Sequence, residues 1–266
     1  MKTLYFTATG NSLYVAKSIG GELLSIPQMV KEGIYEFTDE KIGIVIPLHA
    51  WSVPPFIVDF LKKAMFNCDY LFAVITYGIY SGAVASHLTA IADEEGYKFS
   101  YISRIKMVDN YLPTFDMKKE VEKEGKKEIE HHLRSIISDI SSSKEGTLKE
   151  TVLDKAAMNY MLKRGNKPFN KKRLKVHAAG EGIDNYLYVE DSCIQCGVCA
   201  SVCPVGNIRM DEKTGKIALD DRCFMCFACI HHCPSNAIHI RGEVNSIRFR
   251  NSHIRLNEIV KANNQM

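Results

Sequence analysis

Residues 193–204 read Cys193-Ile194-Gln195-Cys196-Gly197-Val198-Cys199-Ala200-Ser201-Val202-Cys203-Pro204. The four cysteines and the proline recur thirty residues later, as Cys223, Cys226, Cys229 and Cys233-Pro234. Both copies follow the pattern C-x2-C-x2-C-x3-C-P, in which three cysteines at steps of three bind one iron–sulfur cluster and the fourth, redirected by proline, reaches a different one. The pattern predicts two [4Fe–4S] clusters in a module made of two similar halves.

Two other interpretations of these cysteines are weaker. Zinc sites usually pair C-x2-C knuckles across a longer loop, and buried structural thiols need no fixed spacing. Neither interpretation predicts the third cysteine and the proline in both copies. The ninth cysteine, Cys68, has no cysteine neighbour in the sequence, and we assign it no role.

Length and composition bound what the rest of the chain can be. A chain of 266 residues favours two domains, and 46% hydrophobic with 24% charged residues is the composition of an ordinary folded protein. The net charge of +3 is too small for a surface that binds nucleic acid, so we expect no nucleic-acid partner.

Nothing in the sequence predicts a membrane or export segment. No apolar run approaches the ~18 residues that would indicate a membrane span. The first apolar stretch ends at Thr7 and Gly10-Asn11, too early for a signal peptide. We therefore expect a cytoplasmic protein, in which reducing conditions favour cysteines as metal ligands over disulfides.

Short apolar runs alternate with segments of helical spacing over residues 2–107, which predicts an α/β fold with parallel strands and helical crossovers. Asp116–Ser143 is rich in lysine and glutamate and carries one apolar stripe, so it predicts a long amphipathic helix. The expected strands are Thr3–Phe6, Ile42–Ile46, Tyr70–Ile75 and Ser100–Ile105. The expected helices are Ser12–Leu24, one that opens at Pro54-Pro55, and Gly82–Glu95.

The first expected strand is followed by Thr7-Ala8-Thr9-Gly10-Asn11-Ser12 and then directly by a helix. Backbone amides and the positive end of the helix dipole can bind a phosphate at such a place. Gly10 lets the backbone approach closely, and the three hydroxyls can complete the site without a lysine. The hexapeptide resembles the flavodoxin phosphate loop, T/S-x-T-G-N-T/S. This resemblance implies FMN as ligand, bound by Thr7, Thr9, Gly10, Asn11 and Ser12.

Two later loops follow expected strands at the edge of the sheet where ligands of open α/β folds bind, residues 47–52 and 76–82. In flavodoxins the corresponding loops hold the isoalloxazine ring. The resemblance implies that Trp51 and either Tyr77 or Tyr80 stack on the flavin, with backbone groups near Gly78 at the ring edge. The competing interpretation is that these aromatic side chains only pack their own loops.

Over nearly its full length the chain resembles the family of flavodoxin-like proteins fused to a carboxyl-terminal two-cluster ferredoxin, the EFR-type ferredoxins of anaerobes. The resemblance implies an α/β flavodoxin-like doubly wound parallel sheet and a small α+β 2[4Fe–4S] ferredoxin domain. It also implies that the cluster ligands cross over between the repeats. Cys193, Cys196, Cys199 and Cys233 then hold one cluster, and Cys203, Cys223, Cys226 and Cys229 hold the other.

The expected domains are residues 1–163, flavodoxin-like with a long helical extension, and residues 185–242, the ferredoxin domain. We expect residues 164–184, which are basic and glycine-punctuated, to form a linker or irregular segment, and residues 243–266 to form a carboxyl-terminal tail. Lys106–Pro113 also resembles the family, without an assigned role beyond a turn near the surface between the domains. Phe227 departs from the ferredoxin pattern, because the first repeat has Gly197 there, and a bulky apolar residue would shield the second cluster.

Together these sites predict an electron-transfer protein that relays electrons between two [4Fe–4S] clusters and FMN, with redox proteins as partners. One alternative is a flavin-dependent oxidoreductase that reduces a small acceptor. Another is a ferredoxin whose flavodoxin-like half is an empty scaffold that docks a partner. No side chain is assigned as a catalytic acid or base. The pairs His131-His132 and His231-His232 are expected to be solvated or to lie beside cluster ligands.

Overall fold

The computed structural model describes residues 1–49, 52–164, 187–211 and 214–266. Trp51 and nearly all of the predicted linker lie outside this part of the chain. The elements of the amino-terminal part are β1 Lys2–Tyr5, α1 Asn11–Ile19, β2 Glu22–Ser25, α2 Ile26–Glu32, β3 Glu36–Thr38, β4 Lys41–Pro47, α3 Pro55–Leu61, β5 Met65–Asn67, β6 Tyr70–Tyr77, α4 Val84–Glu94, β7 Tyr101–Lys106, α5 Met117–Glu122, the 3-10 helix η1 Glu124–Lys127, α6 Ile129–Ser141 and α7 Val152–Arg164. The elements of the carboxyl-terminal part are β8 Leu187–Val189, α8 Val198–Ser201, β9 Ile208–Met210, β10 Ile217–Leu219, α9 Ala228–His231, β11 Ile238–Ile240 and α10 Leu256–Asn263.

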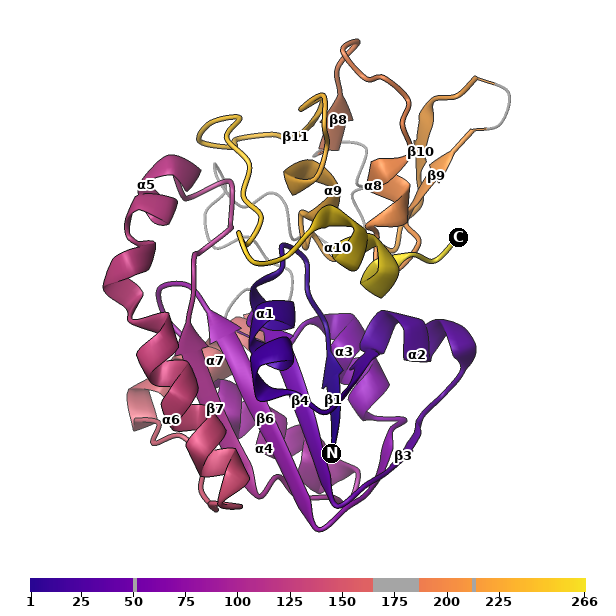
Figure 1. Ribbon diagram of the computed structural model, residues 1–266. Helices are drawn as coiled ribbons and strands as arrows, with labels where there is room; N and C mark the ends of the chain where they lie inside the picture. The colour runs from indigo at the N-terminus through magenta and orange to yellow at the C-terminus, as the bar shows by residue number, and fades with distance from the viewer. Residues whose placement is uncertain (50–51, 165–186, 212–213) are drawn as a thin grey trace.

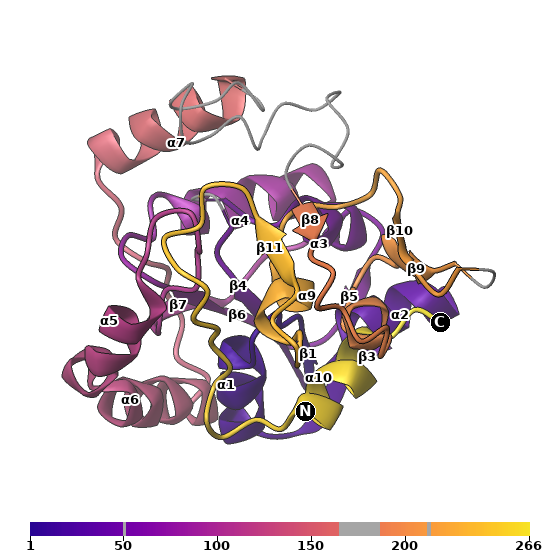
Figure 2. The ribbon, with the colours of Figure 1, turned by 90° about the horizontal axis from the view of Figure 1, so that it is seen from above.

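The central sheet is parallel, with its described strands in the order β2-β1-β4-β6-β7. Counted along the chain within this sheet, the order is 2-1-3-4-5, which is the order of the flavodoxin-like doubly wound fold. The four strands expected from the sequence are confirmed as β1, β4, β6 and β7. Helices α1 and α6 cover one face of the sheet, and α3 and α4 cover the other (Figures 1 and 2).

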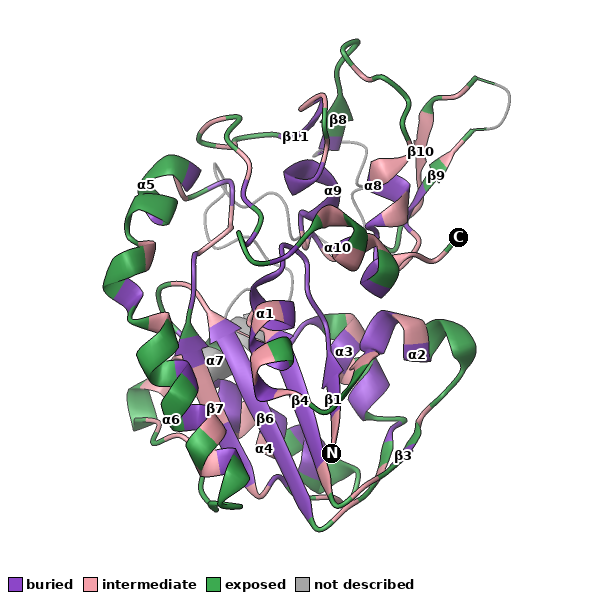
Figure 3. Cartoon of the chain, in the orientation of Figure 1, coloured by how far each residue is buried: buried purple, intermediate pink, exposed green. Residues whose placement is uncertain are grey.

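The core of this domain lies at the middle of the sheet, where β4 and β6 are buried along almost their whole length (Figure 3). Helices cover both faces of a doubly wound sheet, so its central strands are continuous apolar runs rather than alternating ones. Ile42, Ile44, Ile46 and Ile75 are fully buried there. This rigid core fixes the loops at the carboxyl ends of the strands, where the predicted site lies.

The first helix is shorter than the sequence indicated. The prediction of a helix over Ser12–Leu24 is wrong beyond Ile19, because Gly20 takes a left-handed φ of 88° and ends it. Leu23 and Leu24 instead belong to β2, which pairs in parallel with β1. Their spacing fitted a helical face as well as a strand, so only pairing with β1 distinguishes the two.

The single long helix predicted over Asp116–Ser143 is also wrong. The segment divides into α5, η1 and α6, and the left-handed φ of 48° at Glu128 separates the last two. Its apolar stripe is confirmed in α6, since Leu133, Ile136 and Ile140 are buried. The break lets Lys127 turn inward, where its Nζ lies 3.4 Å from a carboxylate oxygen of the buried Glu120.

The carboxyl-terminal part is a small α+β unit that sits above the carboxyl ends of the parallel strands (Figures 1 and 2). Strand β8 pairs antiparallel with β11, and β9 pairs antiparallel with β10. The helices α8 and α9 carry cysteines of the two repeats. Its apolar core also includes Val108, Leu112 and Met117 from the segment after β7, so this segment packs against the cysteine module.

After β11 the chain returns to the amino-terminal domain. We call residues 249–263 the covering segment, because they lie over the loop between β1 and α1. Figure 1 shows α10, near the end of this segment, beside the tip of that loop. Ile254, Ile259 and Ala262 are buried in the core of the flavodoxin-like domain. None of the helices in the described part of the chain has both the length and the apolar composition of a membrane span.

Candidate cluster sites and the phosphate loop

The eight repeated cysteines surround two separate cavities. Three cysteines of the first repeat and Cys233 of the second line one cavity. Three cysteines of the second repeat and Cys203 of the first line the other. Among the described residues, no three His, Cys, Asp or Glu side chains close on one point as they would around a single metal ion. The structure therefore groups the cysteines into the two ligand sets that the resemblance implied, and each set is spread around its own cavity.

The two halves of the module have the same backbone as well as the same cysteines. Each short helix, α8 or α9, begins directly after a residue with a left-handed φ, which is 71° at Gly197 and 61° at Phe227. Gln195 and Met225 share a left-handed φ in the same way. The sharp local turns carry successive cysteines around a common cavity, so the spacing in the sequence becomes a curved wall of thiols.

The fourth cysteine of each repeat accepts a hydrogen bond from the backbone. The Asn207 N–H donates to Cys203 Sγ at 3.1 Å, and the Ala237 N–H donates to Cys233 Sγ at 3.2 Å. Such donors stabilise negative charge on sulfur, and they are one of the means by which a protein sets a cluster potential.

Burial makes a free thiolate costly at four of the other cysteines. It raises the pKa of Cys199 to about 12 and that of Cys223 to about 11. It also raises the pKa of Cys226 and Cys229 well above the ordinary thiol value. Positive charge at the cavity would be needed for all of them to ionise, and coordinated iron supplies that charge. The donor set fits [4Fe–4S] clusters in both cavities.

The two cavities differ in their surroundings. At the first, Cys196 is exposed and Ile194 is 64% exposed. The second faces the flavodoxin-like domain, and Phe227, buried at its wall, lies 5.6 Å from the Tyr111 ring centroid to centroid. Phe224, next to Cys223, packs 4.9 Å from Phe56 in the same measure. The expectation that Phe227 shields the second cavity agrees with its place in the structure.

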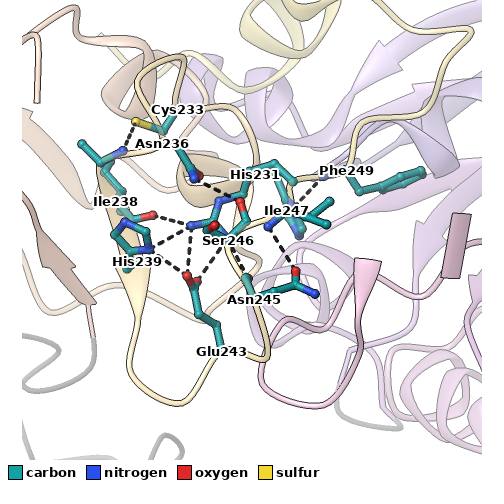
Figure 4. Close-up of polar contacts among 12 residues, drawn as sticks. His231, Cys233, Asn236, Ile238, His239, Glu243, Asn245, Ser246, Ile247 and Phe249 are labelled. Atoms are coloured by element: carbon teal, nitrogen blue, oxygen red, sulfur yellow. Dashed lines mark hydrogen bonds and ion pairs between the residues drawn. The ribbon is translucent and has the colours of Figure 1, made fainter. Parts of the chain in front are cut away.

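Residues 243–248, which follow β11, make polar contacts with one another, with β11 and with the turn after Cys233 (Figure 4). The Arg248 guanidinium donates to both carboxylate oxygens of Glu243 and to the Ile238 carbonyl. The Asn236 Nδ2 donates to the Ser246 carbonyl at 3.1 Å. These contacts tie the residues that lead into the covering segment to β11 and to the turn after Cys233, which lines the first cavity.

His231 joins the cysteine module to the flavodoxin-like domain. Burial lowers its pKa to about 3, so the imidazole is neutral. The Phe249 N–H donates to Nδ1, which leaves Nε2 to donate to the Asn110 carbonyl at 2.9 Å. His231 is therefore buried rather than solvated, and its side chain bridges α9, the covering segment and the segment after β7.

The predicted phosphate loop stands between β1 and α1 as expected, but its polar side chains are already paired within the protein. Thr7 Oγ1 accepts the Gly10 N–H at 3.0 Å, and Ser12 Oγ pairs with Thr76 Oγ1 at 2.8 Å. Thr9 Oγ1 accepts from Asn110 Nδ2 at 2.7 Å, and Asn11 Nδ2 donates to the Val108 carbonyl at 3.0 Å. The loop side chains are buried under the covering segment. The loop as folded does not fit a flavin phosphate.

In the loop of residues 76–82, predicted to hold the flavin ring, the named residues also contact other parts of the chain. The Tyr80 hydroxyl donates to the Asp154 carboxylate in α7, and the Arg104 guanidinium lies over the Tyr77 ring at 5.8 Å. At Gly78, an added Cβ would lie 1.8 Å from Asp109 Oδ2, so this carboxylate fills the space beside the glycine. Burial raises the pKa of Asp109. Trp51 lies outside the described residues.

Sequence reasoning missed the residues that close the phosphate loop: Asn110, Asn251 and Asn263. Asn110 falls in Lys106–Pro113, the segment that the resemblance singled out without a role. Nothing local distinguishes Asn251 or Asn263, because each acts on residues about 240 or more positions earlier in the chain. Only the tertiary structure brings these two side chains to the phosphate loop.

A family model for a 4Fe-4S dicluster domain matches residues 192–245. A comparison with curated proteins finds no match. Among solved structures, the chain is similar to two-electron reduced flavodoxin from Megasphaera elsdenii, with 16% identity, 39% of this chain and 83% of that chain covered, and a TM-score of 0.27. It is similar to an FMN-dependent NADH-azoreductase from Bacillus anthracis, with 14% identity, 52% and 100% covered, and a TM-score of 0.29. It is also similar to the Trp repressor binding protein from Bacillus subtilis, with 10% identity, 52% and 96% covered, and a TM-score of 0.32. The strand order and the dicluster match together describe a flavodoxin-like domain joined to a 4Fe-4S ferredoxin domain, in a chain with an electron-transfer role.

Proposed function

We propose that the chain transfers electrons through two [4Fe–4S] clusters. The observation that supports this most directly is the division of the eight cysteines into two sets around two cavities, each completed by the fourth cysteine of the other repeat. A lone metal-binding loop would not need this exchange. When bound, such clusters supply one-electron redox chemistry.

The residues of the chain hold and tune these centres. Cys193, Cys196, Cys199 and Cys233 would bind one cluster, and Cys203, Cys223, Cys226 and Cys229 the other. The backbone donors at Asn207 and Ala237 stabilise negative charge on sulfur. Phe227 adds a buried apolar side chain to the wall of the second cavity. The protein therefore contributes ligands, burial and electrostatics rather than an acid or a base.

We propose the first cavity as the side at which redox proteins dock. Its wall reaches the surface at Cys196 and Ile194, whereas the second cavity faces the flavodoxin-like domain. Electron transfer between proteins requires close approach of their centres, and the exposed side offers the shorter approach.

The relay predicted from the sequence requires a flavin. The alternative interpretation, an oxidoreductase acting on a small acceptor, requires the same flavin. The loop sequence and its place at the carboxyl end of β1 favour FMN. The buried, internally paired state of the loop favours a ferredoxin on a protein scaffold. We propose the two-cluster function without a flavin step.

The test is anaerobic purification followed by iron, acid-labile sulfide and flavin assays on one sample, with low-temperature EPR of the dithionite-reduced protein. Two clusters predict about eight irons and eight sulfides per chain. Zinc in place of iron, or about four irons, would contradict the proposal. One FMN per chain would restore the three-centre relay.

A further inference from the structure

The covering segment donates three hydrogen bonds to the phosphate loop, two to backbone carbonyls and one to a side chain. The Asn251 N–H donates to the Thr9 carbonyl at 2.9 Å, and Asn251 Nδ2 donates to Asn11 Oδ1 at 3.2 Å. Asn263 Nδ2 donates to the Thr7 carbonyl at 2.9 Å. The segment thus contacts alternate residues of the loop, from Thr7 to Asn11, with neutral amide groups.

The same segment fills the space beside Gly10. A Cβ added at this glycine would lie 3.0 Å from Asn251 Cβ and 3.1 Å from Ile254 Cβ. A phosphate bound by the loop backbone needs this close approach for itself. The sequence suggested that the missing side chain at Gly10 leaves room for a ligand. In the structure, Asn251 and Ile254 occupy that room.

The side chains that make these contacts are buried. Thr7, Thr9 and Ser12 are 1% exposed, Asn251 is 2% exposed and Asn263 is fully buried. Breaking a buried hydrogen bond is costly, because it leaves a buried donor or acceptor unpaired. The segment is also anchored beyond the loop, because Asn263 Nδ2 reaches the Val202 carbonyl of the cysteine module. It therefore joins the loop to the module rather than lying loosely over it.

We propose that the covering segment takes the place of a flavin phosphate on this loop. While it is docked the chain does not bind FMN through the loop, and the flavodoxin-like domain serves as the platform on which the cysteine module is seated. The inference concerns only the loop and the segment, so it stands or falls independently of the cluster content.

The experiment measures FMN and riboflavin binding to the full-length holoprotein by anaerobic equilibrium dialysis. Riboflavin lacks the phosphate, so the ratio of the two affinities isolates the contribution of the loop. We expect FMN to bind the unaltered chain no more tightly than riboflavin does. FMN binding at least about tenfold tighter than riboflavin would overturn the proposal, whatever the variants show.

The paired variant Asn251→Ala, Asn263→Ala removes the side-chain contacts of the segment with Asn11 and Thr7. Hydrogen exchange should increase together at residues 7–13 and 250–263, and the preference for FMN over riboflavin should rise by about tenfold or more. Asn264→Ala is the matched control, because its side chain accepts from the Met266 N–H and should change neither measurement. Release of the segment without a gain in FMN preference would show that the segment does not exclude the phosphate. Iron and sulfide content, measured on each sample, reports the cluster function separately.

Discussion

Cys203 and Cys233 show how a single residue can belong to one repeat in the sequence and to the other in space. Each closes the cavity formed by the three cysteines of the opposite copy. Proline after each cysteine redirects the chain away from its own repeat. The ninth cysteine, Cys68, packs at the edge of the flavodoxin-like core, far from either set in the sequence.

Replacing Cys203 tests this exchange. Cys203→Ala should remove the fourth ligand of the second set, with Cys223, Cys226 and Cys229, and leave the first set complete. We expect the loss of about four irons per chain and of one of the two reduced EPR signals. Cys68→Ala is the control and should keep the full iron content. Equal damage to both signals in the Cys203 variant would contradict the separation of the two sets.

At the scale of elements, the break between α5 and α6 matters because it buries an ion pair. Glu120 and Lys127 have side chains only 5% and 6% exposed, and Lys127 Nζ also donates to the Met107 carbonyl at 2.8 Å. This pair fixes the end of β7, from which residues 108–112 leave to contact both the phosphate loop and the cysteine module. The geometry of the break therefore positions the junction between the domains.

Lys127→Met should destabilise the protein by about 3 kcal/mol, because it leaves the Glu120 carboxylate buried without this partner. Lys123 also pairs with Glu120, but its side chain is 57% exposed. Lys123→Met should therefore cost less than about 1 kcal/mol. Urea unfolding followed by circular dichroism measures both. Equal losses in the two variants would show that burial of the pair does not set its contribution.

The same pair gives a pH dependence. Burial raises the pKa of Glu120, but the hydrogen bond from Lys123 and the charge of Lys127 outweigh it, and the pKa lies below the ordinary carboxyl value. Its contribution to stability is complete above about pH 4.3, the pKa of an unperturbed glutamate, and is lost as the pH falls through the lowered folded value. In urea unfolding at pH 7 and at successively lower pH, the difference between Lys127→Met and the unaltered chain should shrink below that point.

At the scale of the whole molecule, the two parts depend on different forces. The parallel sheet has a continuous apolar core of its own. In the cysteine module the described strands are three residues long, and several cysteines belong to its core. Short strands around thiol-lined cavities have few other stabilising contacts, so the bound clusters become part of the folding free energy.

Removal of iron should therefore unfold the two parts unequally. After anaerobic treatment with a chelator, we expect amides of β8–β11, α8 and α9 to lose hydrogen-exchange protection, while those of β4 and β6 keep it. Exchange read by mass spectrometry gives both in one sample. Full protection of the module in the iron-free chain would show that its fold does not need the clusters.

The sequence by itself determined the cysteine repeat, the parallel strands and the loop between β1 and α1, because each depends on residue spacing over a few positions. The crossing of Cys203 and Cys233 followed from a resemblance, and the cavities agree with it. Strand β2 and the break at Glu128 needed the tertiary structure. In isolation, the residues of β2 fit a helix as well as a strand. The residues around Glu128 fit one continuous helix as well as two separate ones. The covering of the phosphate loop by Asn251 and Asn263 was likewise decided only in three dimensions. The loop motif specifies donors and space for a close approach, whereas what fills that space depends on where a chain segment some 240 residues away comes to lie.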